Sequence, residues 1–183
     1  NKFIKIVSLP FISKQLFSSA RKKIKPTAFI EINKTLVNEF YTDNEIPLFM
    51  GFRLVIVDGS TLQLPESDSI REKYGTCENQ YESGEMSMAR ISFAYDPLSG
   101  LTLDAIMRPY RVSEKPMAFE HIVNIQPSNC GDDLYLFDRG YPFITLIFFL
   151  IIHNKQFVMR SSTAWLSEVN EILHSGKRDV IIE

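Results

Sequence analysis

The sequence has few of the residues that build disulfide scaffolds or zinc sites. Its two cysteines, Cys77 and Cys130, lie far apart and form no C-x-x-C motif. Two isolated thiols are typical of a protein in a reducing compartment. The three histidines, His121, His153 and His174, are too scattered for metal-ligand spacing and are interpreted as structural. A disulfide framework and a zinc module are therefore excluded as the basis of the fold.

Long apolar runs are also missing. A helix needs about 20 apolar residues to cross a bilayer, and the apolar run at residues 143–152 has half that length. It predicts a buried helix, and no membrane partner is expected. The N-terminal segment has no small-residue cleavage site, so no signal peptide is predicted. The chain begins with Asn1 and stops at Glu183 just after an apolar run, from which we expect a piece of a longer protein.

The charge is distributed unevenly. The apolar fraction is 45%, the charged fraction 23% and the formal net charge -2, which are ordinary values for a globular protein and exclude a basic nucleic-acid binder on overall charge. Residues 1–35 nevertheless contain one acid, Glu31, and eight basic residues: Lys2, Lys5, Lys14, Arg21, Lys22, Lys23, Lys25 and Lys34. Such an excess favours phosphate contacts. A basic, solvated helix face explains it equally well.

The hydrophobic pattern predicts helices first and strands afterwards. Residues 1–44 read as two helices separated by Pro26. Residues 52–57 form a short apolar run that is typical of a central strand buried on both faces, and this strand is expected to end at Asp58. Residues 65–85 are polar and predict a long loop. Two alternating segments around a turn at residues 96–100 then predict an antiparallel hairpin.

The second half of the pattern predicts a crossover. Ser113 is expected to cap a helix with Glu114 in its first turn. Residues 134–137 form another apolar strand ending at Asp138, and an apolar helix and a strand over residues 156–160 follow. A strand–helix–strand crossover favours parallel neighbours in an α/β fold. Ligands gather at the carboxyl ends of such strands, which makes Asp58 and Asp138 candidate partners.

Two neighbouring carboxylates have a defined chemistry. Without a cation they repel, and one would hold a proton. With magnesium, which prefers oxygen ligands, both ionise and serve as metal ligands for phosphodiester chemistry. The structural alternative is that Asp58 and Asp138 each cap a turn, as aspartates at strand ends often do.

The contexts of these two aspartates resemble a known family. Val-Ile-Val-Asp-Gly-Ser at residues 55–60 and Leu-Phe-Asp-Arg-Gly-Tyr at residues 136–141 look like the first and second acidic motifs of DDE transposases. The resemblance is to the bacterial insertion-sequence-four group, whose second motif typically reads Asp-Arg-Gly-Tyr. Residues 157–161 also resemble that group, and the helix that begins at Glu114 does so more loosely. The match covers roughly residues 50–161.

The resemblance implies a ribonuclease H-like catalytic domain, with a mixed five-stranded sheet of order 3-2-1-4-5 flanked by helices. It implies cleavage of transposon ends and strand transfer into target DNA, with two Mg²⁺ or Mn²⁺ ions and no covalent enzyme intermediate. Asp58 and Asp138 would be metal ligands, and Arg160 would reach the DNA near the cut end. Arg139 would lie beside the scissile phosphate, or alternatively hold its turn by an ion pair. Tyr141 is expected to pack rather than to contact DNA, and Gly140 to serve backbone geometry.

The family's third carboxylate has no counterpart in the sequence. It is a glutamate in a Tyr-x-x-Arg-x-x-x-Glu helix, and no such pattern follows Asp138. The expected organisation is a helical basic segment at residues 1–45, a catalytic core at 46–161, and the beginning of a β-rich insertion at 162–183. The third glutamate is then expected beyond residue 183. Glu168, Glu171 and Glu183 are interpreted as surface residues.

The expected partners are double-stranded DNA, contacted by Arg21, Lys22, Lys23 and Lys25, and a second copy of the chain in a homodimer on DNA. The expected location is the bacterial cytoplasm, at the nucleoid. Other functions stay open. A truncated transposase can bind DNA or a full-length partner without catalysis. Another ribonuclease H-like nuclease, such as a resolvase, fits the same plan. A phosphatase with Asp58 as its nucleophile fits less well, because Ser60 stands where a second aspartate is usual.

Overall fold

The computed structural model describes residues 13–43, 45–78, 84–162 and 167–176. The chain divides into two compact units, residues 1–36 and 37–183. The first unit contains α1 (Lys14–Arg21) and the beginning of α2 (Pro26–Asp43). The Ser13 side chain caps α1 by accepting a hydrogen bond of 3.2 Å from the backbone N–H of Leu16. The two predicted helices are confirmed for the described residues, and residues 1–12 lie outside them.

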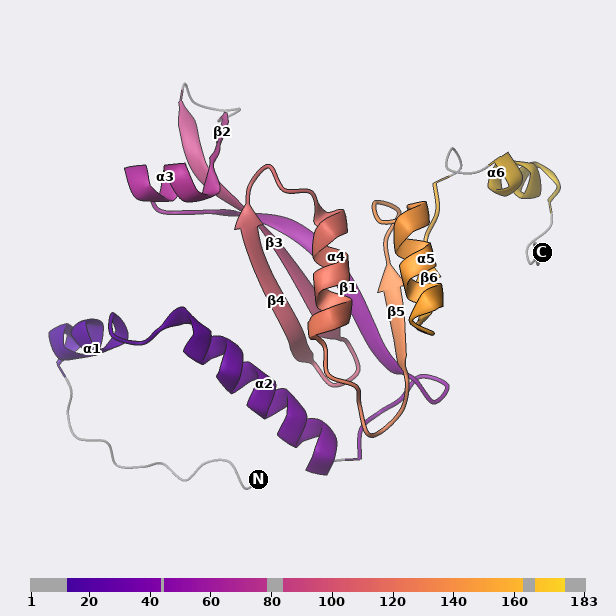
Figure 1. Cartoon of the computed structure of the whole chain (residues 1–183), viewed down its shortest axis with the longest axis horizontal. Coiled ribbons are helices and arrows are strands. Elements are labelled where there is room, and N and C mark those ends of the chain that lie inside the picture. The colour runs from indigo at the N-terminus through magenta and orange to yellow at the C-terminus, as the bar shows by residue number, and fades with distance from the viewer. Residues whose placement is uncertain (1–12, 44, 79–83, 163–166, 177–183) are drawn as a thin grey trace. The chain divides into compact units, whose positions relative to one another are not determined.

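The second unit is built on a mixed sheet of six strands, which confirms the predicted α/β class. Its main strands follow in the spatial order β4 (Leu101–Pro109), β3 (Glu85–Asp96), β1 (Arg53–Gln63), β5 (Asp133–Phe137) and β6 (Gln156–Met159). The strand β3 pairs antiparallel with β1 and β4, and β5 pairs parallel with β1 and β6. The predicted hairpin is β3–β4. Figure 1 shows β1 in the middle of this arrangement.

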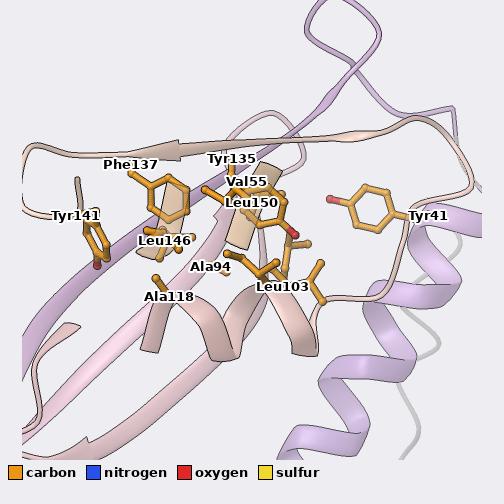
Figure 2. Close-up of a cluster of buried hydrophobic side chains, with 13 residues drawn as sticks. Tyr41, Val55, Ala94, Leu103, Ala118, Tyr135, Phe137, Tyr141, Leu146 and Leu150 are labelled. Carbon is orange, nitrogen blue, oxygen red and sulfur yellow. The ribbon is translucent and has the colours of Figure 1, made fainter. Parts of the chain in front are cut away.

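Two helices cover one face of the sheet and form the core with it. They are α4 (Glu114–Asn124) and α5 (Ile144–Ile152). Their buried side chains pack against the alternate residues of β1 and β5 that face them, as Figure 2 shows for Leu146, Leu150, Val55 and Tyr135. Edge-to-face contact of Phe119 with Phe149, at 5.0 Å between ring centroids, joins the two helices.

The region predicted as a long loop, residues 65–85, contains regular structure instead. It holds α3 (Asp68–Tyr74) and the short strand β2 (Thr76–Glu78), which pairs with the first residues of β3. Ser67 caps α3, and its side chain accepts a hydrogen bond from the backbone N–H of Ile70. The Glu66 carboxylate accepts hydrogen bonds from the backbone and side chain of Ser87. Polar residues here make specific hydrogen bonds that a polarity pattern does not reveal.

Two burial predictions are wrong for a common reason. The strand β1 is buried on one face only, because Leu54 and Ile56 are half-buried whereas Val55 and Val57 are buried. The helix α5 buries Leu146 and Leu150 but exposes four apolar side chains: Ile144, Phe148, Ile151 and Ile152. Both helices pack on the same face of the sheet, so the apolar residues that point away from this layer stay uncovered.

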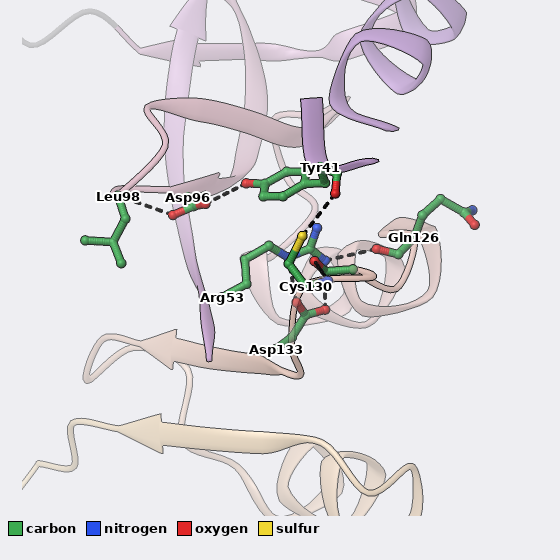
Figure 3. Close-up of polar contacts among 8 residues, drawn as sticks. Tyr41, Arg53, Asp96, Leu98, Gln126, Cys130 and Asp133 are labelled. Atoms are coloured by element: carbon green, nitrogen blue, oxygen red, sulfur yellow. Dashed lines mark hydrogen bonds and ion pairs between the residues drawn. The ribbon is translucent and has the colours of Figure 1, made fainter. Parts of the chain in front are cut away.

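A buried ion pair fixes the first residues of the parallel strands. Arg53 and Asp133 face each other across β1 and β5, and their side chains are only 2% and 4% exposed. The Arg53 guanidinium donates two hydrogen bonds to the Asp133 carboxylate, at 2.6 and 3.0 Å, and a third to the Gln126 carbonyl at 2.9 Å. Figure 3 shows this arrangement. The two buried charges, on Arg53 and Asp133, are therefore paired, as their burial requires.

The last turn of α2 joins the same network. Tyr41 is buried, its ring lies 4.8 Å from the Arg53 guanidinium, and its hydroxyl donates to Asp96 at 2.5 Å. Burial raises the pKa of Tyr41, and the hydrogen bond to Asp96 raises it further. The Cys130 thiol donates to the Tyr41 carbonyl at 3.0 Å. This end of α2 is thereby anchored to the sheet within the second unit.

No helix among the described residues is long and apolar enough to cross a membrane. Within the region expected to begin a β-rich insertion, residues 167–176 contain α6 (Ser167–His174). Residues 163–166 and 177–183 lie outside the described part of the chain.

Arg53→Met is expected to destabilise the fold by about 3–5 kcal/mol, because it leaves the Asp133 carboxylate buried without its partner. Urea unfolding measures this loss. The matched control is Arg71→Met, which breaks an exposed ion pair with Glu66 and is expected to cost less than about 1 kcal/mol. Equal losses in the two variants would contradict the role assigned to Arg53.

Candidate functional site

The register of β1 and β5 brings Asp58 and Asp138 together. The last paired residues of these parallel strands are Val57 and Phe137, and each aspartate follows directly. The prediction that Asp58 ends its strand is wrong, because β1 continues to Gln63 alongside β3. The long antiparallel partner β3 extends β1 beyond the point at which β5 stops. Asp58 therefore lies at the step between the two pairings, next to Asp138 on the adjacent strand.

Each of the two aspartates is held by one carboxylate oxygen. Asp58 Oδ1 accepts the backbone N–H of Gly59 at 2.9 Å, and Asp138 Oδ1 accepts that of Gly140 at 2.8 Å. Both residues are exposed, and within the described chain neither Oδ2 has a hydrogen bond or an ion pair. Gly140 has no positive φ. It instead leaves room for Asp138, since an added Cβ would lie 3.1 Å from Asp138 Oδ1. The expectation that Gly140 serves backbone geometry is therefore replaced by a steric role.

Arg160 extends the row of charged residues. Met159 is the partner of Phe137 on β6, and the Arg160 backbone N–H donates to the Phe137 carbonyl at 3.0 Å. Asp58, Asp138 and Arg160 thus follow equivalent positions on three neighbouring strands. Arg160 and Arg139 are exposed, and neither forms an ion pair with any residue that the structure describes. The alternative of an ion pair that holds the Arg139 turn receives no support.

Sequence reasoning gave no site role to Glu114, which lies next to this row. Glu114 is the first residue of α4, and its Oε1 forms an ion pair of 3.0 Å with Arg90 on β3. Its side chain covers Gly59, where an added Cβ would overlap Glu114 Cγ and Cδ and lie 2.8 Å from Oε2. The crossing of α4 over β1 is a long-range contact, so no local sequence signal indicates it.

A buried polar chain supports the backbone at Asp58. His121 Nδ1 lies 2.8 Å from Asp104 Oδ2, and His121 Nε2 lies 2.9 Å from Ser92 Oγ. The Ser92 hydroxyl donates to the Asp58 carbonyl at 3.2 Å. Burial would raise the pKa of Asp104, but the hydrogen bonds from His121 and Asn124 and the charge of His121 lower it overall. The expectation that His121 is structural agrees with this geometry.

Ser92, His121 and Asp104 are connected in the same order as the residues of a hydrolase catalytic triad. They lack the solvent access that such a triad needs. Ser92 and His121 are both 0% exposed. A nucleophile must reach the substrate, and this hydroxyl is turned toward the Asp58 carbonyl. The arrangement therefore fixes the position of Asp58 and does not make Ser92 a nucleophile.

Tyr141 lies beneath the same row of residues. It is 1% exposed and packs on Phe137 at 5.5 Å between ring centroids, so the predicted packing role is confirmed. Burial raises the pKa of Tyr141, and the negative charges of Glu114, Asp58 and Asp138 raise it further, while a hydrogen bond with Ser92 lowers it.

The basic residues predicted to contact DNA belong to the first unit. Arg21 is the last residue of α1, and Lys22, Lys23 and Lys25 lie between α1 and α2. All four side chains are exposed. They form an open, positively charged connection between two helices, with no ion pair to any described residue.

The donor set at Asp58 and Asp138 consists of carboxylate oxygens, which are the ligands that magnesium and manganese prefer. In the part of the chain that the structure describes, no group of three or more acidic, histidine or cysteine side chains is arranged to hold a metal ion. The two free Oδ2 atoms fit a cation in chemical type, and they do not by themselves enclose it.

Comparisons of the chain with protein-family models, with curated proteins and with solved structures found no match.

Asp104→Asn is expected to lower stability above about pH 3.8, the ordinary pKa of this carboxyl, and to have little effect in stronger acid. The folded-state pKa of Asp104 is lowered, so its ionised form stabilises the wild type above that pH, and this contribution disappears as the carboxyl is protonated. Urea unfolding of both proteins across the acid range measures the difference. A difference that is the same at every pH would contradict the ionised Asp104–His121 contact.

Proposed function

We propose that this chain carries the catalytic core of a DDE-type DNA transposase, with a ribonuclease H-like fold and two of the metal-binding carboxylates at Asp58 and Asp138. The observation that carries the proposal is their adjacency, one residue past the last pair of β1 and β5. Two apolar strands far apart in sequence each end their parallel pairing at an aspartate. Turn-capping aspartates have no reason to share a register position across neighbouring strands.

The strand order supports the fold part of the proposal. When the short β2 is left out and the other strands are numbered along the chain, their order across the sheet is third, second, first, fourth and fifth. The first three are antiparallel and the last two are parallel to the first. This is the order expected of a ribonuclease H-like sheet, in which the acidic residues lie on the first and fourth strands. Asp58 lies on the first of these strands, β1, and Asp138 directly follows the fourth, β5.

Each residue of the site would have a separate role in phosphodiester chemistry. A bound divalent cation supplies Lewis-acid chemistry, which lowers the pKa of attacking water or hydroxyl and stabilises the leaving oxygen. Asp58 and Asp138 would hold it through the oxygens not bonded to Gly59 and Gly140. The exposed guanidinium of Arg160, aligned with Asp138 on the next strand, would bind a DNA phosphate beside it. Arg139 would bind another phosphate of the same DNA strand.

The basic residues at the α1–α2 connection suit the DNA backbone outside the catalytic site. Arg21, Lys22, Lys23 and Lys25 are exposed and without acidic partners among the described residues. This observation also fits the second candidate function, a transposase fragment that binds DNA or a second copy of the chain without catalysis. Cleavage and strand transfer separate the two, because only the first function requires Asp58 and Asp138.

Asp58→Ala and Asp138→Ala are each expected to abolish the binding of Mn²⁺ to the full chain, because each removes one of two adjacent oxygen ligands. Isothermal titration measures the binding. Asp68→Ala, at the exposed beginning of α3, is the control and is expected to bind as the wild type does. Binding that survives unchanged in both site variants would refute the cation site.

Neutralising Lys22, Lys23 and Lys25 together is expected to flatten the salt dependence of DNA binding. Each lysine that neutralises a phosphate contributes about 0.9 to the slope of log K against log salt. Fluorescence anisotropy with duplex DNA at several salt concentrations gives the slope. Neutralising Lys73 and Lys155 of the second unit serves as the control. An unchanged slope in the first variant would assign these lysines to a merely solvated helix face.

A further inference from the structure

The buried His121 has no part in the proposed chemistry, yet both of its ring nitrogens face a polar group. It lies on α4 and is 0% exposed. Nδ1 lies 2.8 Å from Asp104 Oδ2 on β4, and Nε2 lies 2.9 Å from Ser92 Oγ on β3. A neutral imidazole has one N–H donor and one acceptor, whereas an imidazolium ion has two donors. The needs of the two partners therefore decide which form the protein holds.

Asp104 requires a donor on Nδ1. Burial opposes the ionisation of Asp104, but the hydrogen bonds from His121 and Asn124 outweigh burial and hold the pKa of this carboxyl below its usual value. The Asn124 amide donates to the same oxygen, Oδ2, at 3.1 Å. An ionised carboxylate only accepts hydrogen bonds. The proton between Asp104 and His121 therefore lies on Nδ1.

Ser92 requires a donor on Nε2 as well. The Ser92 hydroxyl has a single proton, and it donates this proton to the Asp58 carbonyl at 3.2 Å, because a carbonyl oxygen can only accept. The Ser92 oxygen is then left to accept from His121. Tyr141 also bonds to Ser92, but its hydroxyl carries a proton of its own. A neutral His121 would take the Ser92 proton on Nε2 and leave the Asp58 carbonyl without it.

The backbone at Asp58 depends on this bond more than its neighbours do. The parallel pairing of β1 with β5 stops at Val57, and beyond it β1 continues beside β3. The bond from Ser92 comes from β3 and fixes the peptide group that follows the Asp58 side chain. A ligand-bearing residue has to be held to within about 0.5 Å of its productive position, so a bond of this kind contributes to cation binding.

We propose that His121 is held as an imidazolium ion and that, through Ser92, it positions Asp58 for cation binding. The inference rests on the proposed function, because that function makes Asp58 a metal ligand. His121 is a positioning residue, since it contacts neither cation nor substrate. The charge of Asp104 holds the second ring proton, the doubly protonated ring leaves the Ser92 proton to Asp58, and Ser92 fixes the Asp58 backbone.

The proton on Nε2 is measured by nitrogen-15 NMR of the imidazole rings in the full chain at neutral pH. Both nitrogens of His121 are expected to carry protons. The exposed His153 and His174 supply reference signals of solvated rings in the same spectrum. An unprotonated Nε2 in His121 would overturn the inference.

Asp104→Asn tests the origin of the charge, because it keeps the shape of the side chain and removes its negative charge. His121 is expected to become neutral and to accept the Ser92 proton, so that its Nε2 signal changes to that of an unprotonated nitrogen. Asn124→Ala is the matched control, since it removes a neutral donor from the same Asp104 oxygen and leaves the charge. His121 is expected to keep both protons in the control. Both protons retained in Asp104→Asn would overturn the inference.

The affinity for Mn²⁺ tests the positioning of Asp58. Asp104→Asn and Ser92→Ala are each expected to weaken binding about tenfold in isothermal titration, as is usual for groups that orient a metal ligand. Circular dichroism verifies that both variants are folded. The double variant is expected to bind no more weakly than Ser92→Ala, because both changes remove the same bond to Asp58. Losses that add in the double variant would overturn the inference.

The outcomes distinguish this inference from the function it rests on. Wild-type Mn²⁺ affinity in Ser92→Ala, together with loss of binding in Asp58→Ala and Asp138→Ala, overturns the positioning role and leaves the proposed function in place. Binding that is unaffected by Asp58→Ala and Asp138→Ala overturns both. Loss in the aspartate variants, tenfold weakening in Ser92→Ala and a doubly protonated His121 support both.

Discussion

The Arg53–Asp133 ion pair is the constraint from which the geometry of the site follows. These residues face each other across β1 and β5, and the buried pair is satisfied in one register only. A slip by one residue would turn every side chain of the strand to the other face of the sheet. With Arg53 opposite Asp133, Val57 falls opposite Phe137, and the next residues are Asp58 and Asp138. The ion pair at the beginning of the strands thus fixes the adjacency of two carboxylates farther along them, where the parallel pairing stops.

The site lies where two kinds of pairing meet. The strand β1 continues beside the antiparallel strand β3 after the parallel strand β5 has ended. This step leaves Asp58 and Asp138 exposed while the residues before them are buried. The polar chain from Asp104 through His121 and Ser92 holds the Asp58 carbonyl from the side of β3 and α4. Rigid support below and solvent access above are the conditions under which acidic side chains bind a cation and a large substrate.

Much of the fold was predictable because its signals are local. The hairpin turn at residues 96–100, the beginning of α4 after Ser113 and the apolar strand before Asp138 can each be recognised from a few neighbouring residues. The expected cap is only positional, because the Ser113 side chain makes no capping hydrogen bond. The rule for parallel strands placed Asp58 and Asp138 at strand ends, and the family resemblance placed those strands side by side. The continuation of β1 beyond Asp58 was not, because it depends on the length of β3. The exposure of Ile144 and Phe148 was also not predictable, since it depends on which face of α5 meets the sheet. Glu114 was missed because its contact with Gly59 joins α4 to β1 across the fold.

The central claim is that Asp58 and Asp138 hold a divalent cation together. A crystal structure of the chain grown with Mn²⁺ tests it most directly, because anomalous scattering locates the ion without reference to any assumed role. The account predicts a manganese peak within coordination distance of carboxylate oxygens of both aspartates. Manganese bound elsewhere, or no peak at these two residues at saturating Mn²⁺, would contradict it.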